Sequence, residues 1–268
     1  MKQETRHKIK GFLEGFIQGL IEEHKQPITK PTHGISGRAS KKGNFKPFHE
    51  ALLPEGILRI NRFERSFSTK LGTTFEEVAR LIAQDYHAEA KRGYVVRGNV
   101  STEAIRIIEN IINTIGSGRV KKDFPDLINE VLGTSTAGGE TRTRIADLYL
   151  KSRTGKEYYF EIKSPKPNKG QCLEATDRLL QIYAIRRIAP PQLNTFYAMA
   201  YNPYGDNKNE YNHSFAKNYM DLKNQVLIGK EFWDLVGGVG SYEEVLAIYQ
   251  EVGKEKGPDM LDQLALNY

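Results

Sequence analysis

The sequence is poor in cysteine and in long apolar runs. Its 268 residues contain one cysteine, Cys172, which excludes a disulfide framework, a Cys-x-x-Cys redox pair and a cysteine-rich zinc site. No apolar run approaches the ~20 residues that cross a bilayer, and the N-terminal residues lack the pattern of a cleavable signal. We therefore expect no membrane contact and a cytoplasmic location.

Acidic residues are scarce in two stretches. Residues 25–47 hold six lysines and arginines and no acid, and residues 151–187 hold nine bases against four acids. The whole chain carries a formal net charge of +6 at pH 7. A polyanionic partner such as nucleic acid fits this distribution. A basic surface without a partner is the alternative.

The hydrophobic pattern predicts a folded α/β protein. Hydrophobic residues make up 39% of the chain, which suits a packed core. Apolar spacings of three and four residues predict helices, and alternating spacings predict strands. The expected helices are 3–24, 74–86, 102–115, 124–132, 172–187 and 242–256, and the expected strands are 145–150, 157–163 and 195–201. These elements predict a mixed β-sheet flanked by helices, with an N-terminal helical region.

A β-hairpin is predicted at residues 145–163. Gly155 is placed for the left-handed position of a three-residue loop centred on Thr154. Strands symmetric about Thr154 form an apolar face from the pairs Leu150–Tyr158, Leu148–Phe160 and Ala146–Ile162. The other face consists of the pairs Lys151–Glu157, Tyr149–Tyr159 and Asp147–Glu161, with Lys163 next along the strand.

Asp147 and Glu161 are carboxylates that repel each other if they are directly opposed. Their hydrophobic and aromatic neighbours predict a half-buried site. A shared proton, the ammonium of Lys163 or a divalent cation would offset the repulsion. Mg²⁺ takes carboxylate and carbonyl oxygens, and a lysine beside the attacked phosphate suits metal-assisted phosphodiester hydrolysis. A surface hairpin with ordinary ion pairs is the alternative.

The sequence Ala146-Asp147 followed by Glu161-Ile162-Lys163 resembles the signature of the PD-(D/E)XK nuclease superfamily, with alanine where the family name has proline. Residues 63–76 resemble the N-terminal helical region of type II restriction endonucleases. Residues 229–233, Gly-Lys-Glu-Phe-Trp, resemble a segment of enzymes that cut interrupted GG/CC palindromes. Over residues 55–240 the chain is similar to the TdeIII-like restriction endonucleases.

This resemblance implies a restriction-endonuclease-like core and a role for each motif residue. Asp147 and Glu161 would bind Mg²⁺, or Mn²⁺ in its place, with the Ile162 carbonyl, and Lys163 would orient or deprotonate the attacking water. The implied substrate is double-stranded DNA at a short palindrome of the GGNCC type, cut to 5′-phosphate and 3′-hydroxyl ends. Cutting both strands implies a homodimer. The cognate DNA methyltransferase of a restriction-modification system would be a genetic rather than a physical partner.

The resemblance also divides the chain into two expected parts. Residues 1–60, with the amphipathic helix and the basic stretch, would serve dimerisation or clasp DNA, and residues 61–268 would form the catalytic and DNA-recognition domain. A further carboxylate often joins such sites, and the candidates are Glu76, Glu77 and Glu140. Glu77 equally fits a capping box with Thr74 at the start of the helix 74–86.

Basic and amide side chains are expected to contact DNA. Candidates for the phosphate backbone are Lys166, Lys169 and Arg178. The polar stretch 202–225 is one candidate for base readout, through Asn207, Lys208, Asn209, His213 and Lys217. The basic arm, with Lys41 and Lys42, would reach into a groove or clasp the duplex. Solvated helix faces and ordinary polar loops are the alternatives.

Two rival functions stay open at this point. One is a repair or Holliday-junction nuclease of the same superfamily, which would require a branched substrate. The other is a non-catalytic DNA-binding protein whose carboxylates are structural.

Overall fold

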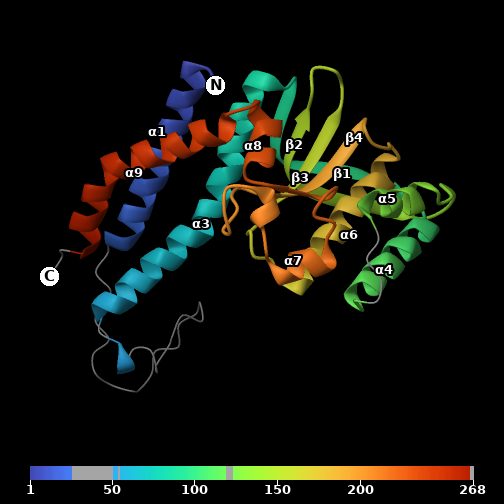
Figure 1. Cartoon of the computed structure of the whole chain (residues 1–268), viewed down its shortest axis with the longest axis horizontal. Helices are drawn as coiled ribbons and strands as arrows, with labels where there is room; N and C mark the ends of the chain where they lie inside the picture. The colour runs from blue at the N-terminus through green and yellow to red at the C-terminus, as the bar shows by residue number, and fades with distance from the viewer. Residues whose placement is uncertain (26–50, 54, 119–122, 266–268) are drawn as a thin grey trace. The chain divides into compact units, whose positions relative to one another are not determined.

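The computed structural model describes residues 1–25, 51–53, 55–118 and 123–265. Its elements are α1 (Gln3–Lys25), α3 (Glu55–Tyr86), β1 (Glu89–Val100), α4 (Thr102–Gly116), α5 (Phe124–Leu132), β2 (Glu140–Lys151), β3 (Glu157–Ile162), α6 (Lys169–Arg186), β4 (Leu193–Met199), η1 (Lys208–Glu210), α7 (Ser214–Tyr219), β5 (Val226–Ile228), α8 (Lys230–Gly237) and α9 (Ser241–Ala265). All of them except η1 and β5 are labelled in Figure 1. They form two compact units. The sheet unit is Met1–Arg6 with Phe75–Val245, and the helical unit is His7–Thr74 with Leu246–Tyr268.

The sheet unit is built on a five-stranded mixed sheet with the order β1-β2-β3-β4-β5. The strands β1, β2 and β3 are antiparallel neighbours, and β3, β4 and β5 are parallel. Helix α6 crosses between the parallel strands β3 and β4 and packs against the sheet, while α4 and α5 pack against α6. The predicted α/β class, with a mixed sheet flanked by helices, is confirmed.

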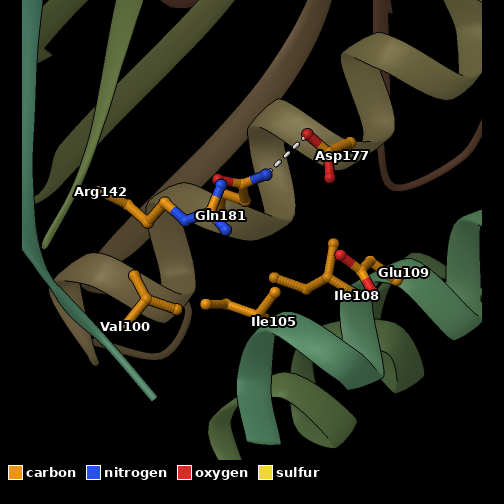
Figure 2. A pocket seen from close by; sticks show the side chains of 7 residues that line it. All are labelled: Val100, Ile105, Ile108, Glu109, Arg142, Asp177 and Gln181. Carbon is orange, nitrogen blue, oxygen red and sulfur yellow. Dashed lines mark hydrogen bonds between the residues drawn. The ribbon is translucent and has the colours of Figure 1, made fainter. Parts of the chain in front are cut away.

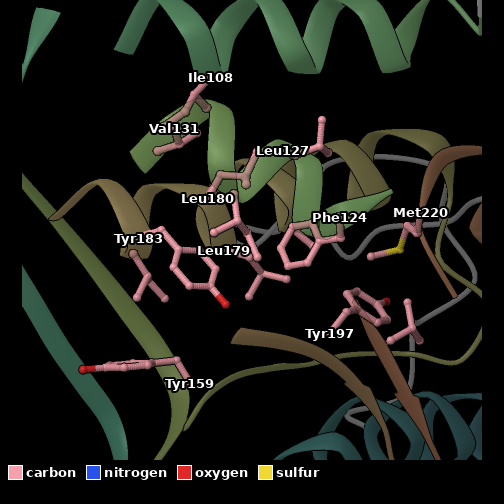
Figure 3. Close-up of a cluster of buried hydrophobic side chains, with 14 of the residues drawn as sticks. Ile108, Phe124, Leu127, Val131, Tyr159, Leu179, Leu180, Tyr183, Tyr197 and Met220 are labelled. Carbon is pink, nitrogen blue, oxygen red and sulfur yellow. The ribbon is translucent and has the colours of Figure 1, made fainter. Parts of the chain in front are cut away.

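The main hydrophobic core lies between the sheet and α6. Leu179, Leu180 and Tyr183 recur at short helical spacing on α6 and meet Tyr159 of β3 and Tyr197 of β4 (Figure 3). All five side chains are buried, and burying one such side chain stabilises the fold by roughly 1.5–3 kcal/mol. This packing fixes α6 over β3 and so positions the side chains at the end of that strand.

The helical unit buries the apolar stripe of α1. Ile9, Leu13, Ile17, Leu20 and Ile21 are all buried, as expected for a stripe that packs rather than one that lies on a membrane. No helix in the described ranges is long and apolar enough to cross a membrane.

The prediction that a helix begins at residue 74 is wrong. The predicted helix is the last part of α3, which begins at Glu55, so Thr74 lies inside a helix and caps nothing. The Thr74 hydroxyl donates to the Leu71 carbonyl at 2.7 Å and lies 2.8 Å from the Tyr249 hydroxyl. The predicted boundary at residue 60 also falls inside α3, and the proposed division of roles between 1–60 and 61–268 stays a prediction.

Strand β1 was not expected from the sequence. Its twelve residues contain Gly93 and Gly98, which interrupt the alternation of Tyr94, Val96 and Val100. Tertiary pairing with β2 along its length forms the strand despite this composition. The predicted DNA contacts Lys41 and Lys42 lie outside the described residues.

Candidate active site

The β2–β3 hairpin has the predicted register only near its turn. Four pairs from Lys151–Glu157 to Leu148–Phe160 form as expected, and Gly155 has a positive φ of 85°. The predicted pairs Asp147–Glu161 and Ala146–Ile162 do not form, although all four residues lie in the described part of the chain. The two strands separate at this point, so the expectation of a regular ladder through the site was wrong.

The carboxylate of Asp147 fills the gap between the separated strands. Its Oδ2 accepts a hydrogen bond from the Ile162 amide at 2.8 Å, where a regular ladder would use a backbone carbonyl. The same oxygen accepts a hydrogen bond from Lys163 Nζ, also at 2.8 Å. Asp147 is therefore held to β3 through its side chain.

Asp147, Glu161 and Lys163 meet at one place. Lys163 Nζ lies 2.8 Å from Asp147 Oδ2 and 3.5 Å from Glu161 Oε2, so both carboxylates contact one ammonium group. The side chains of Glu161, Asp147 and Lys163 are 2%, 18% and 42% exposed. Glu161 is thus more deeply buried than predicted, and the site opens to solvent on the side of Lys163.

Arg178 of α6 also reaches this cluster. Its Nη1 lies 3.4 Å from Glu161 Oε2, and its Nη2 donates to Glu174 Oε1 at 2.6 Å. The sequence suggested that Arg178 contacts DNA phosphate but gave no sign of its approach to Glu161. The feature that brings Arg178 to Glu161 is the β3–α6–β4 crossover, which lays one face of α6 over β3.

Two carboxylates, Asp147 and Glu161, meet two cations, Lys163 and Arg178, so burial rather than an excess of negative charge dominates at Glu161. Burial, together with the charge of Asp147, raises the pKa of Glu161 to about 7, although Lys163 and Arg178 act in the opposite direction. Burial lowers the pKa of Lys163, but its hydrogen bond to Asp147 and the charges of both carboxylates outweigh this, so the pKa lies above its ordinary value. Lys163 is therefore a protonated donor, and a further cation close to Glu161 would favour the ionised form of this buried carboxyl.

The residues present fit a hard divalent cation. Asp147 and Glu161 supply carboxylate oxygens, which Mg²⁺ prefers as ligands together with water. The Ile162 carbonyl stays a predicted ligand from the resemblance. The unfavourable charge of the buried pair is the physical reason that a cation would bind here rather than at an ordinary ion pair.

The three candidates for a further carboxylate lie in other contacts. Glu76 and Glu77 contact Arg92, at 2.8 and 3.2 Å, and Glu140 pairs with Arg142 at the opposite end of β2 from the hairpin turn. Within the described residues, no group of three or more His, Cys, Asp or Glu side chains is placed to hold a metal. None of these glutamates joins Asp147 and Glu161 in such a group.

A small pocket lies apart from these carboxylates. It measures about 50 Å³ and is lined by Val100, Ile105, Ile108, Glu109, Arg142, Asp177 and Gln181, between α4 and α6 (Figure 2). Its lining includes none of Asp147, Glu161 and Lys163, and its volume is too small for a nucleotide. This pocket is therefore not part of the candidate site.

Several predicted DNA contacts lie in or against the segment that follows β3. The Lys166 ammonium lies 5.6 Å from the centre of the Tyr204 ring, and the Lys169 ammonium 5.3 Å from that of Tyr219. His213 Nε2 lies 2.8 Å from the Pro167 carbonyl oxygen. These contacts join the segment that follows Lys163 to the polar stretch 202–225.

The other predicted contacts in this stretch differ in how accessible they are. Lys208 Nζ donates to the Val226 carbonyl at 2.6 Å and pairs with Glu231 at 2.7 Å, so it fastens the stretch to β5 and α8. The Asn207 amide donates to Glu210 at 2.8 Å, Asn209 is exposed, and Lys217 donates to Asn212 at 2.9 Å. A role of these side chains in DNA binding stays a prediction. In the segment 229–233, Phe232 and Trp233 are buried core residues of α8.

Comparison with known proteins identifies the family. Residues 1–253 match the family described as Type II restriction endonuclease, HinfI. The chain is 42% identical over 266 residues to the Type II restriction enzyme HgiCII, and 43% identical over 267 residues to the Type II restriction enzymes HgiBI and HgiEI, all from Herpetosiphon aurantiacus. Each alignment covers 97% of both chains. The restriction endonuclease is therefore supported over the repair nuclease and the non-catalytic DNA-binding protein: the chain belongs to the HinfI family of type II restriction endonucleases.

Proposed function

We propose that this restriction endonuclease cuts both strands of a short palindromic DNA site by Mg²⁺-dependent hydrolysis at a PD-(D/E)XK centre. The observation that carries the proposal is the meeting of Asp147 and Glu161 around Lys163 Nζ, at 2.8 and 3.5 Å. A deeply buried Glu161 beside the partly buried Asp147 is costly to keep in its ionised form unless the pair serves a purpose beyond folding.

In the proposed mechanism, Asp147, Glu161 and the Ile162 carbonyl hold the cation, which is Mg²⁺ or Mn²⁺. The cation, when bound, would neutralise charge on the attacked phosphate and lower the pKa of the attacking water. The Ile162 amide and Lys163 hold Asp147 in place through hydrogen bonds of 2.8 Å each. The chain thus fixes its ligands before substrate arrives.

Lys163 acts as a donor in this mechanism rather than as a base. Its ammonium stays protonated because Asp147 and Glu161 raise its pKa. Its Nζ–H groups would donate to a phosphate oxygen and so orient the phosphate for in-line attack by water opposite the 3′-oxygen. The water's proton would pass to the solvent as the P–O3′ bond breaks, and the 3′-oxygen would take a proton from the solvent. The products would be a 5′-phosphate and a 3′-hydroxyl.

The palindromic target and the homodimer belong together. One centre per chain cuts one strand, so a two-fold symmetric dimer on a two-fold symmetric site cuts both. The GGNCC type of target rests on the TdeIII-like resemblance, in which residues 229–233 resemble a segment of enzymes that cut interrupted GG/CC palindromes. The stretch 202–225 is the proposed site of base reading. A cognate methyltransferase would protect the same site in the host.

The test is digestion of phage DNA by the purified protein with Mg²⁺, followed by sequencing of the fragment ends. We expect discrete fragments that share one palindrome, no cutting in EDTA, and no cutting by Asp147→Ala. Asp126→Ala, which removes an exposed aspartate of α5, is the matched control and should cut normally. Cleavage that requires branched DNA, cleavage that survives Asp147→Ala, or no cleavage by the unaltered protein with either Mg²⁺ or Mn²⁺ would each overturn the proposal.

A further inference from the structure

The pairing of β1 with β2 is interrupted at one position, opposite the active site. The two strands pair from Glu89–Lys151 to Val100–Glu140, but the pair Gly93–Asp147 is missing, although both residues are described. Gly93 has a φ of +58°, in the left-handed region that side chains disfavour. The interruption therefore coincides with a backbone conformation that glycine adopts readily.

On both strands, the faces to which successive side chains point are exchanged at this interruption. Ala146 and Tyr149 are three residues apart, so a regular strand would place them on opposite faces, yet both belong to the core beneath α6. On β1, Lys91 and Tyr94 are likewise three apart, yet the Lys91 ammonium lies 5.7 Å from the centre of the Tyr94 ring. The Tyr94 ring stacks on Tyr149 with centroids 4.0 Å apart and an interplanar angle of 14°. The alternation of side chains is thus reversed on both strands across Gly93 and Asp147.

The reversal releases Asp147 from regular pairing on both sides. On the β1 side, Asp147 does not pair with Gly93, which lies opposite it. On the β3 side, the ladder that starts at the hairpin turn ends at Leu148, one residue short of Asp147. The carboxylate is then free to accept the hydrogen bonds from Ile162 and Lys163, at 2.8 Å each. A regular β2 strand would not leave the Ile162 amide to a side chain.

We propose that Gly93 is a positioning residue for Asp147: its left-handed backbone turns β2 so that the Asp147 carboxylate faces Ile162 and Lys163. The inference rests on the proposed function, because it assigns Gly93 to the placement of a proposed metal ligand. Apart from Gly93 and its two chain neighbours, no atom of the described residues lies within 4 Å of the place that a Cβ on Gly93 would occupy. The requirement is therefore for a backbone conformation and not for space.

The test compares Gly93→Ala, Gly93→Val and Gly93→Asn with the control Gly155→Ala. Gly155 is matched because it also has a positive φ, of 85°, and because no described atom outside its chain neighbours lies within 4 Å of an added Cβ. It differs in lying in the hairpin turn. Asparagine tolerates the left-handed region better than alanine, and valine tolerates it least. We expect kcat to fall about 10-fold for Gly93→Ala and about 100-fold for Gly93→Val, with KM for DNA unchanged, whereas Gly93→Asn stays within about threefold.

A second readout follows the Ile162 amide by hydrogen exchange in the metal-free full-length protein. Gly93→Ala and Gly93→Val should speed exchange of this amide by about 10-fold relative to the amides near the turn, and Gly155→Ala should not. The inference is overturned if Gly93→Ala and Gly155→Ala are alike in both readouts, or if Gly93→Asn is as impaired as Gly93→Val. If the unaltered protein does not cut with Mg²⁺, the proposed function fails, and the exchange of Ile162 still decides whether Gly93 positions Asp147.

Discussion

Strand β3 carries two glutamates, the partly buried Glu157 and the deeply buried Glu161, that differ in how their charge is met. Both oxygens of Glu157 accept hydrogen bonds from Arg186, at 2.9 and 3.0 Å, and Glu157 also accepts the Tyr159 hydroxyl at 2.8 Å. Glu161, four residues along, has its two cationic neighbours at the longer distances of 3.5 Å for Lys163 and 3.4 Å for Arg178. The same strand therefore holds one carboxylate with short hydrogen bonds to a cation, Glu157, and one whose cationic neighbours lie farther away, Glu161.

The difference separates structural from functional use of a buried carboxylate. Short, charge-assisted hydrogen bonds repay the cost of burying Glu157. Glu161 instead faces Asp147, and its pKa of about 7 reports the uncompensated cost. The molecule tolerates this cost at the end of the hairpin where the proposed cation would bind. Changes at the two glutamates should accordingly have opposite effects.

The largest effect should be on cleavage at the Asp147 end of the hairpin. Asp147→Asn should lower kcat at least on the order of 10³-fold, because it removes a ligand charge, and Lys163→Ala should lower it roughly 10²–10³-fold. Both variants should keep DNA affinity, measured without metal by fluorescence anisotropy. Glu157→Gln is the matched control and should cut at nearly the normal rate once its lower stability is allowed for. A large loss of DNA affinity in Lys163→Ala would show that this lysine mainly anchors DNA.

The next effect is on stability. In EDTA at pH 8, Glu161→Gln should raise the free energy of unfolding by on the order of 1–3 kcal/mol, because it removes a buried charge that its surroundings disfavour. Glu157→Gln should lower it by about 1–3 kcal/mol, because the Arg186 charge loses its partner. Urea denaturation measures both values. If both variants lose stability equally, the distinction between the two glutamates is wrong.

The stability difference at Glu161 should depend on pH. The folded protein holds the proton of Glu161 up to a pKa of about 7, against an ordinary value of 4.5, so between these values it binds more protons than the unfolded chain. Stability from this group is therefore greatest below pH 4.5 and falls as the pH rises to about 7. The advantage of Glu161→Gln over the unaltered protein should grow across this window, measured by urea denaturation in EDTA. An advantage that is constant with pH would assign it to packing instead.

The smallest effect should come from Arg178. Its guanidinium lowers the pKa of Glu161, so Arg178→Gln should raise that pKa further and weaken binding of the cation near neutral pH. We expect cleavage to fall about three- to tenfold at pH 7 and less at pH 8.5. The control Arg106→Gln changes an exposed arginine of α4 and should have no pH-dependent effect. A loss that is the same at both pH values would instead indicate a contact with DNA phosphate, as the sequence suggested.

The local parts of the structure were predictable from sequence. The hairpin turn at Gly155, the four regular pairs beside it and the helix 124–132 follow from nearby residues alone. The start of α3 was not predictable, because Gly72 and Thr74 suggest a helix boundary at a place where the helix is continuous. Local propensity loses there to tertiary packing.

The candidate site was predictable in its residues but not in its geometry. The spacing of Asp147, Glu161 and Lys163 was enough to bring the three together on one hairpin. The separation of β2 from β3 at Asp147 was not foreseen, because it depends on Gly93 in a strand that the sequence did not reveal. The approach of Arg178 likewise depends on how α6 crosses the sheet.

The central claim is that Asp147 and Glu161 together hold the cation that cleavage requires. Calorimetric titration of Mn²⁺ into the protein bound to a cleavage-resistant cognate duplex tests it most directly, with Asp147→Asn, Glu161→Gln and the control Glu157→Gln measured alongside. The account predicts a site that is present in the unaltered protein and in Glu157→Gln and absent from the other two variants. Unchanged Mn²⁺ binding in Asp147→Asn and Glu161→Gln would contradict it.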